Sequence, residues 1–185
     1  MNELEKKVDF WPDGYPFDGE GYQRFLDYAF ATSDFFMLVF VAYQGHMTQQ
    51  KKALREELRP YKVKRRTDPS WPGTLVTYSI NTRYQVTFYR TDPQAKAIVK
   101  RIPSLYAWDR QFLPQDLAFF RGDQCWFASV AHEQMAFLLH ATKEDIALMT
   151  EIGAIKPGDV EPMTDDDLTY YAQFDEKLVR PKNNR

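Results

Sequence analysis

Apolar positions recur along the chain with two different periods, and the changes of period mark the expected elements. Between residues 20 and 32 they fall three and four apart, which places them on one face of a helix. Residues 34–43 include nine consecutive apolar residues, a pattern typical of a strand that is buried on both faces. A second helix is predicted from Thr48 to Pro60, and a third begins at Asp92-Pro93.

Residues 61–66 show strand-like alternation, with Tyr61 and Val63 on one face and Lys62, Lys64 and Arg66 on the other. Such a pattern predicts a half-exposed edge strand, because lysines at a sheet edge discourage pairing with other chains. Further strands are predicted at 75–80 and 83–90, where β-branched and aromatic residues are frequent.

Residues 116–140 predict a three-stranded meander. Gly122-Asp123 is typical of a tight hairpin turn, and pairing across it places Phe119 opposite Trp126. A second turn at His132-Glu133 places Val130 opposite Met135. Both registers predict one continuous apolar face, which consists of Leu117, Phe119, Trp126, Ala128, Val130, Met135, Phe137 and Leu139.

The two ends of the chain differ from its middle. Residues 9–19 combine two prolines with four aromatic residues and predict an irregular lid over the core. Residues 156–185 predict a linker followed by a peripheral acidic helix and tail, with the helix at 164–178. We therefore expect residues 1–155 to form a single α+β domain, with a mostly antiparallel sheet packed by several short amphipathic helices.

Composition narrows the class of protein. Hydrophobic residues make up 44% of the 185 residues and aromatic residues 16%, which excludes a disordered chain. The single cysteine excludes an intrachain disulfide and a cysteine-rich zinc site. Neither a secretory signal nor an apolar run of membrane-spanning length is present, so we expect a cytoplasmic protein that does not insert into a membrane.

Charge is distributed unevenly. The net charge is −2, yet residues 46–66 carry eight basic and two acidic residues. A protein that coats nucleic acid needs a basic excess over the whole domain, so we do not expect nucleic acid as the main partner. The basic segment most simply complements acidic parts of the same surface.

Few residues suggest catalysis. The chain lacks the common phosphate-binding, nucleophile-elbow and zinc-protease motifs, and no cofactor or metal is expected. Cys125 and His140 are cross-strand neighbours in the predicted meander, but their apolar surroundings predict an inert thiol. A small enzyme with a pocket near Cys125, His132, Glu133 and His140 is the alternative.

The basic strand and the loop after it are the other candidate site. The side chains of Lys62, Lys64, Arg65, Arg66 and Trp71 are suited to a phosphate, a nucleotide or an acidic partner, with Trp71 as a stacking surface. The alternative is a lysine-protected edge strand whose Trp71 packs inward.

Three strings resemble a family of small bacterial cytosolic proteins of uncharacterised function, some of which are labelled stage III sporulation proteins. They are DFFMLVFVAY (34–43), DPSWPGT (68–74) and DLAFFRGDQCWF (116–127), and the resemblance spans about residues 8–155. It brings no catalytic residues with it and implies at most a link to sporulation.

The sequence as a whole favours a non-catalytic cytoplasmic domain that interacts with a protein partner. Abundant aromatic residues and segregated charge support this hypothesis, and both immunity-like neutralisation and sporulation-linked regulation are compatible with it. The alternatives are the small enzyme described above and weak binding of nucleotide or nucleic acid through residues 62–71.

Overall fold

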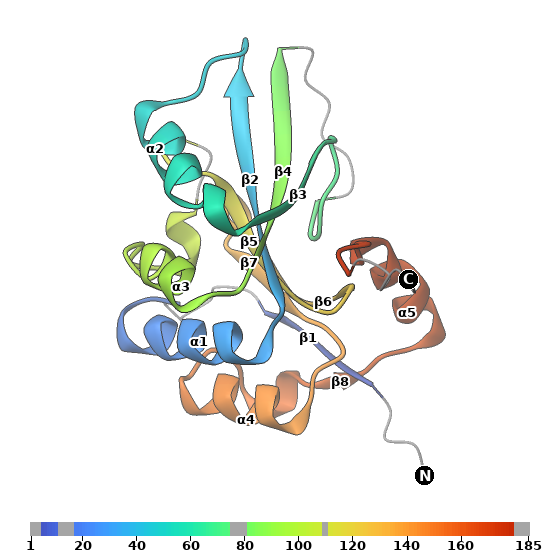
Figure 1. The fold of residues 1–185 in the computed structure, drawn as a ribbon. Helices are drawn as coiled ribbons and strands as arrows, with labels where there is room; N and C mark the ends of the chain where they lie inside the picture. The colour runs from blue at the N-terminus through green and yellow to red at the C-terminus, as the bar shows by residue number, and fades with distance from the viewer. Residues whose placement is uncertain (1–4, 11–16, 75–80, 109–110, 180–185) are drawn as a thin grey trace, which may run out of the picture.

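An eight-stranded antiparallel sheet forms the centre of the computed structural model (Figure 1), with the strand order β3-β4-β2-β5-β6-β7-β1-β8. The structure describes residues 5–10, 17–74, 81–108 and 111–179. The strands are β1 (Lys6–Phe10), β2 (Phe35–Tyr43), β3 (Lys62–Thr67), β4 (Thr82–Arg90), β5 (Gln115–Arg121), β6 (Gln124–Val130), β7 (Met135–Leu138) and β8 (Glu161–Pro162). Every pair of neighbouring strands is antiparallel, which confirms the predicted α+β class.

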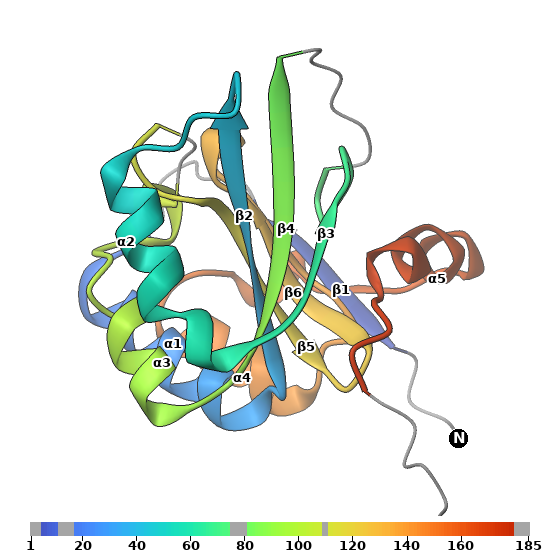
Figure 2. The same cartoon turned by 45° about the horizontal axis from the view of Figure 1, so that its top comes forward.

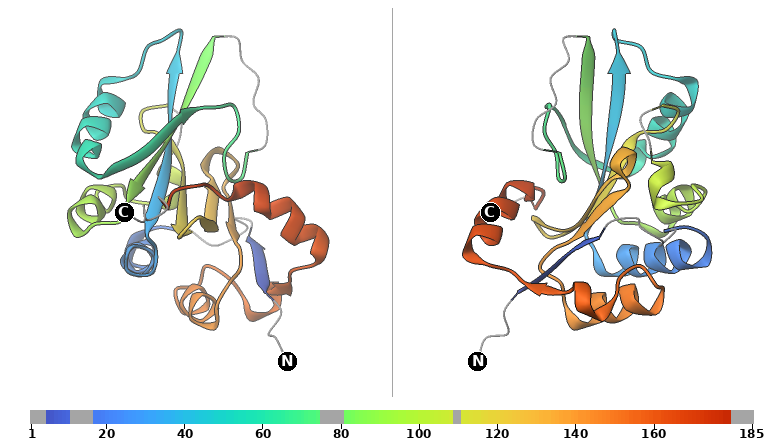
Figure 3. Two further views of the ribbon diagram at one scale, coloured as in Figure 1. Left: turned by 45° about the vertical axis from the view of Figure 1, so that its right-hand side comes forward. Right: turned by 180° about the vertical axis from the view of Figure 1, so that it is seen from behind.

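Helices cover both faces of this sheet. They are α1 (Gly19–Thr32), α2 (Gln49–Glu57), α3 (Pro93–Val99), α4 (Lys143–Glu151) and α5 (Asp165–Tyr171). The first four lie on one side and α5 lies on the other, as the view from behind also shows (Figure 3). Within the described residues, no helix has the length and apolar character needed to cross a bilayer.

Four helix starts follow from local capping. The side chain of Thr48 accepts a hydrogen bond from the backbone of Lys51, and Asp92 does the same for Gln94. Thr142 and Thr164 each begin a helix with a complete capping box. These bonds satisfy amides that the first helical turn leaves without partners, so the helix starts are encoded locally.

The central strand β2 separates two apolar clusters. Phe36, Leu38 and Phe40 face the cluster under α1–α4, whereas Met37 and Val39 face the cluster under α5. Alternate side chains of a strand point to opposite faces, so a strand inside a two-sided core must be apolar at every position. The unbroken apolar run of the sequence predicted this arrangement, and the structure confirms it.

The C-terminal segment contradicts the prediction of a peripheral helix. Tyr171, Phe174 and Leu178 are 5%, 2% and 4% exposed and belong to the second cluster. The helix α5 ends at Tyr171 and a 3₁₀ turn follows, instead of one helix that continues to residue 178. This segment is the layer that covers the second face of the sheet, and that face would otherwise be an apolar surface in water.

The meander forms with one change of register. Strands β6 and β7 pair as predicted, with Val130 opposite Met135. Between β5 and β6, however, a bulge shifts the pairing, so that Phe119 lies opposite Phe127 instead of Trp126. The second turn is a 3₁₀ turn, Ala131–Glu133, closed by Gln134 in the left-handed region, and not a two-residue turn.

The bulge distributes the predicted apolar face over both clusters. Phe119 and Trp126 remain buried together, with ring centroids 6.3 Å apart under the helices α1–α4. Ala128 and Leu139 instead face the cluster under α5. An extra residue in one strand reverses the side of the sheet to which the following residues point, and the hydrophobic pattern alone does not reveal it.

The N-terminal region was predicted only in part. Strand β1 was not predicted. Val8 is the one residue of this strand described as buried and apolar, so the sequence shows no alternation there that would indicate a strand. Of the lid, residues 11–16 lie outside the described residues, as does the predicted strand at 75–80. Phe17 is buried and its ring meets that of Phe25 edge-on at 5.1 Å, so this part of the lid packs on the core.

Candidate anion-binding site

Strand β3 lies at the edge of the sheet, beside β4 and next to the end of α2 (Figure 2). Its pairing with β4 contains a bulge between Lys62 and Lys64. Lys62 lies opposite Tyr89 and Arg65 lies opposite Thr87, so these two cations share one face of the sheet. The predicted face of Lys62, Lys64 and Arg66 is therefore wrong, because the bulge offsets the alternation by one residue.

Lys64 and Arg66 occupy the opposite face, where the C-terminal segment neutralises them. Glu176 accepts from Lys64 Nζ at 2.6 Å and from Arg66 Nε at 2.7 Å. Both cations also lie over the ring of Phe88, within about 6 Å of its centroid. Two of the four basic residues predicted for a site therefore hold the chain's own C-terminal segment.

Trp71 is 4% exposed, so its ring offers no surface for a base to stack on. Its indole Nε1 donates to Asp116 Oδ2 at 2.7 Å, and the amide of Ala131 donates to Asp116 Oδ1 at 2.8 Å. Gly73 keeps the loop close to β6, because a Cβ there would lie 2.8 Å from Val130 Cγ2. The inward-packing alternative thus describes Trp71.

Burial raises the pKa of Asp116 to about 6, although hydrogen bonds from Ala131 and Trp71 act in the opposite direction. In the unfolded chain this carboxyl has an ordinary pKa of about 3.9. Between these values the folded state binds a proton that the unfolded state does not bind, so lowering the pH stabilises the fold through this group.

We expect the unfolding free energy of the wild type, relative to Asp116→Asn, to rise by about 2 kcal/mol from pH 7 to pH 4.5. Urea titrations of both proteins at the two pH values measure this difference. Asparagine tolerates the positive φ of 57° at this position and does not titrate, so contributions from other groups cancel. Equal pH dependence in the two proteins would contradict the prediction.

The face of β3 that carries Lys62 and Arg65 borders a cavity of about 160 Å³. Its lining comes from α2, the turn after it, β3 and β4, and consists of Arg55, Glu56, Arg59, Lys62, Arg65, Thr87 and Tyr89. The four cations face a single carboxylate, Glu56, which pairs with Arg59 at 3.6 Å. In the described part of the chain, no carboxylate lies within ion-pair distance of Lys62 or Arg65.

Tyr89 forms the buried wall of this cavity. Its ring stacks on Phe36 at a centroid distance of 5.1 Å, and the residue is 1% exposed. Its hydroxyl has no hydrogen bond of normal geometry to any described residue, although the Thr87 hydroxyl lies close. A buried polar group without a partner costs free energy, and a hydrogen bond from this hydroxyl to a ligand would remove that cost.

The charges near the Tyr89 hydroxyl are positive. Burial raises the pKa of Tyr89, while the Thr87 hydroxyl and the positive charges of Arg55 and Arg65 lower it in part. The hydroxyl therefore lies within electrostatic reach of arginines from two different elements. It is a neutral phenol at physiological pH, so it can donate a hydrogen bond to an anion that the arginines attract.

The residues of the predicted enzyme pocket have separate surroundings and no hydrogen bond to one another that could form a catalytic pair. His132 and Glu133 lie in the 3₁₀ turn with side chains 47% and 55% exposed. Cys125 is fully buried, its Sγ contacts the carbonyl of Phe127 at 3.4 Å, and burial raises the pKa of its thiol. His140 instead bonds through Nδ1 to the carboxylate of Glu5.

No hydrogen bond joins Cys125 and His140, although the pairing of β6 with the residues after it follows the predicted register as far as Leu139. Strand β7 ends at Leu138, and the next amide, that of Leu139, donates to the carbonyl of Trp126. None of the hydrogen bonds of Cys125 reaches a histidine. With a raised thiol pKa and no adjacent base, Cys125 is poorly suited to act as a nucleophile.

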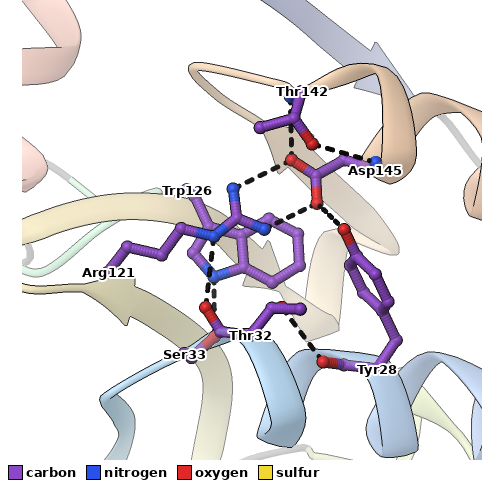
Figure 4. A network of polar contacts seen from close by, with 7 residues as sticks. All are labelled: Tyr28, Thr32, Ser33, Arg121, Trp126, Thr142 and Asp145. Atoms are coloured by element: carbon purple, nitrogen blue, oxygen red, sulfur yellow. Dashed lines mark hydrogen bonds and ion pairs between the residues drawn. The ribbon is translucent and has the colours of Figure 1, made fainter.

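A polar network between helices and sheet is structural in character (Figure 4). Arg121 of β5 makes a two-point ion pair with Asp145 of α4, at 2.6 and 2.9 Å. Tyr28 of α1 donates to the same carboxylate at 2.7 Å, and the guanidinium lies 4.2 Å from the ring centroid of Trp126. Every charged member has a protein partner, so the network ties α1, α4 and the sheet together.

A larger hollow of about 630 Å³ lies at the end of β2. Its lining residues are Val41, Tyr43, His46, Thr48, Lys51, Thr82 and Gln111. This set has no excess of one charge comparable to that of the basic cavity, and Thr82 and Gln111 lie close to segments outside the described residues. Among the residues that are described, no group of three histidine, cysteine or acidic side chains is arranged to hold a metal ion.

Sequence reasoning identified Lys62 and Arg65 but missed Arg55, Arg59 and Tyr89. The excess of basic residues between 46 and 66 was the available indication. It includes Arg55 of α2 and Arg59 of the turn that follows. Comparison of the chain with models of protein families, with curated proteins and with solved structures gave no match.

Proposed function

We propose that the protein is a non-catalytic interaction domain that binds an acidic segment of a partner protein at the basic cavity and the adjacent edge of β3. The observation that carries this proposal is the concentration of four cations around one cavity with a single carboxylate among them. Like charges held together repel one another, so the arrangement favours the arrival of an anionic group.

A protein segment suits this surface better than a nucleic acid. The chain has a net charge of −2, and its acidic residues outnumber basic ones on both sides of residues 46–66. Long polyanions need an extended basic surface, whereas a few cations suffice for a short acidic segment. In addition, no described residue pairs its backbone with the outer edge of β3, and an extended peptide can add to such an edge.

The small-enzyme alternative has less support. Its nucleophile candidate, Cys125, is buried with a raised thiol pKa, and its two histidines make other contacts. The nucleotide alternative shares the basic cavity with our proposal, but Trp71, its stacking residue, is buried. Both are separated from the proposal by the test that follows.

The test is quantitative affinity capture from the source cell with the double variant Arg55→Glu/Arg65→Glu. We expect a partner protein to be recovered with the wild type and lost with this variant. The matched control is Lys52→Glu/Arg83→Glu, which changes the net charge equally at two exposed residues outside the cavity. The control should still recover the partner.

Two results would contradict the proposal. Recovery of the same proteins with the Arg55→Glu/Arg65→Glu variant would show that the cavity is not the binding surface. Recovery that is abolished by nuclease treatment would identify nucleic acid as the ligand instead.

A further inference from the structure

The basic cavity is too small for most whole ligands. At about 160 Å³ it lies below the roughly 300–1,000 Å³ of typical small-molecule sites. A nucleoside or a peptide backbone does not fit inside it, but a single compact group does. The cavity therefore selects one group of a ligand whose remaining part lies outside, on β3 and α2.

We propose that this group is a terminal phosphate monoester, held by Arg55 and Arg65 and by a hydrogen bond from the Tyr89 hydroxyl. The inference rests on the proposed function, since it specifies the chemistry of the anionic segment that binds this face. A carboxylate of the ligand is the competing choice, and charge and the number of donors distinguish the two.

Charge favours a phosphate over a carboxylate. The cavity carries four cations against Glu56, which already pairs with Arg59. A carboxylate brings one negative charge, whereas a phosphate monoester brings between one and a half and two at pH 7. The dianion therefore balances more of the charge of Arg55, Lys62 and Arg65, which lack a carboxylate partner among the described residues.

The donors also match a phosphate. Arginine presents paired N–H groups that bind two oxygens of a phosphate at once, and the cavity holds arginines from α2 and from β3. A third acceptor oxygen remains, and the unpartnered hydroxyl of Tyr89 at the buried wall is the donor available for it. A carboxylate has two oxygens, so it offers these converging donors fewer acceptor sites than the three terminal oxygens of a phosphate.

The phosphate has two possible sources, a phosphorylated side chain of a partner protein and a small phosphorylated molecule. Isothermal titration of the full chain separates them, with a phosphoserine peptide, its unphosphorylated counterpart, its serine-to-glutamate counterpart and adenosine monophosphate as probes. All peptides carry the same acidic flanking residues. We expect the phosphoserine peptide to bind at least tenfold more tightly than either of the other peptides.

Tyr89→Phe is the decisive variant, because it removes the hydroxyl and leaves the ring stacked on Phe36. We expect it to weaken binding of the phosphoserine peptide about tenfold, with little change in the binding of the unphosphorylated peptide. Arg65→Met should lower the affinity for the phosphoserine peptide by more than tenfold. Arg83→Met, which lies outside the cavity, should leave that affinity unchanged. The Tyr89→Phe variant should unfold at a temperature equal to or above that of the wild type, because it removes a buried hydroxyl that has no hydrogen bond of normal geometry.

The outcomes separate this inference from the proposed function. If all three peptides bind equally and Tyr89→Phe has no effect, the phosphate inference fails while the interaction domain stands. If no probe binds and the charge-reversed variant still recovers the partner, both fail. Tighter binding of adenosine monophosphate than of the phosphoserine peptide would support the phosphate site but overturn the partner segment as its source.

Discussion

Removal of residues 164–185 is expected to abolish the cooperative unfolding of the domain. Tyr171, Phe174 and Leu178 are buried against the face of the sheet that carries Met37 and Phe120. Burial of each large apolar side chain contributes about 1.5–3 kcal/mol, so the three together contribute about 5–9 kcal/mol. That is comparable to the total stability of a typical domain, about 5–15 kcal/mol.

Urea unfolding followed by circular dichroism measures this effect. A chain that ends after Val179 is the control, because it retains every described contact of the segment and should unfold like the full chain. The single variant Phe174→Ala keeps the segment and should lose about 3–5 kcal/mol of unfolding free energy. Cooperative unfolding of the chain truncated before Thr164, at unchanged stability, would show that the segment is peripheral after all.

Arg121→Met is expected to lower the unfolding free energy by about 3–5 kcal/mol. Burial opposes ionisation of Asp145, but Arg121 and the hydrogen bonds from Thr142 and Tyr28 outweigh it and hold the pKa of this carboxyl below its ordinary value. The Asp145 side chain is fully buried, so loss of Arg121 leaves its negative charge without a cation. Methionine retains much of the apolar stem of arginine, so the loss reports mainly on the charge.

The matched control for Arg121→Met is Arg24→Met. Arg24 also pairs with a carboxylate, Glu151, at 2.8 Å, but the two side chains are 42% and 63% exposed. Exposed ion pairs contribute less than about 1 kcal/mol, so this variant should be nearly as stable as the wild type. Equal losses in the two variants would mean that the network of Figure 4 is no stronger than a surface ion pair.

The elements that the sequence determined by itself are those with local causes. The faces of α1 and β2 follow from the spacing of their own apolar residues, and the starts of α2 and α4 follow from Thr48 and Thr142. The second turn of the meander was predicted at the right place, and with it the pairing of β6 and β7. Each of these features depends on residues within a few positions along the chain.

The site was only partly predictable, because its residues come from separate elements. The basic segment was visible in the sequence, but the bulge in β3 decides that Lys62 and Arg65 share a face while Lys64 and Arg66 bind Glu176. Tyr89 carries no sequence feature that distinguishes it from the other core tyrosines. Its hydroxyl becomes significant only because β4 places it beside Arg55 and Arg65.

The chain thus encodes its helices, its central strand and its excess of positive charge directly, since periodicity, capping and composition act over short distances. Tertiary structure alone decided that the C-terminal segment is part of the core, that Trp71 packs on Asp116, and that four cations surround one cavity. These features depend on which faces of the sheet remain uncovered and on strand bulges. Both are settled only when segments far apart in the sequence pack together.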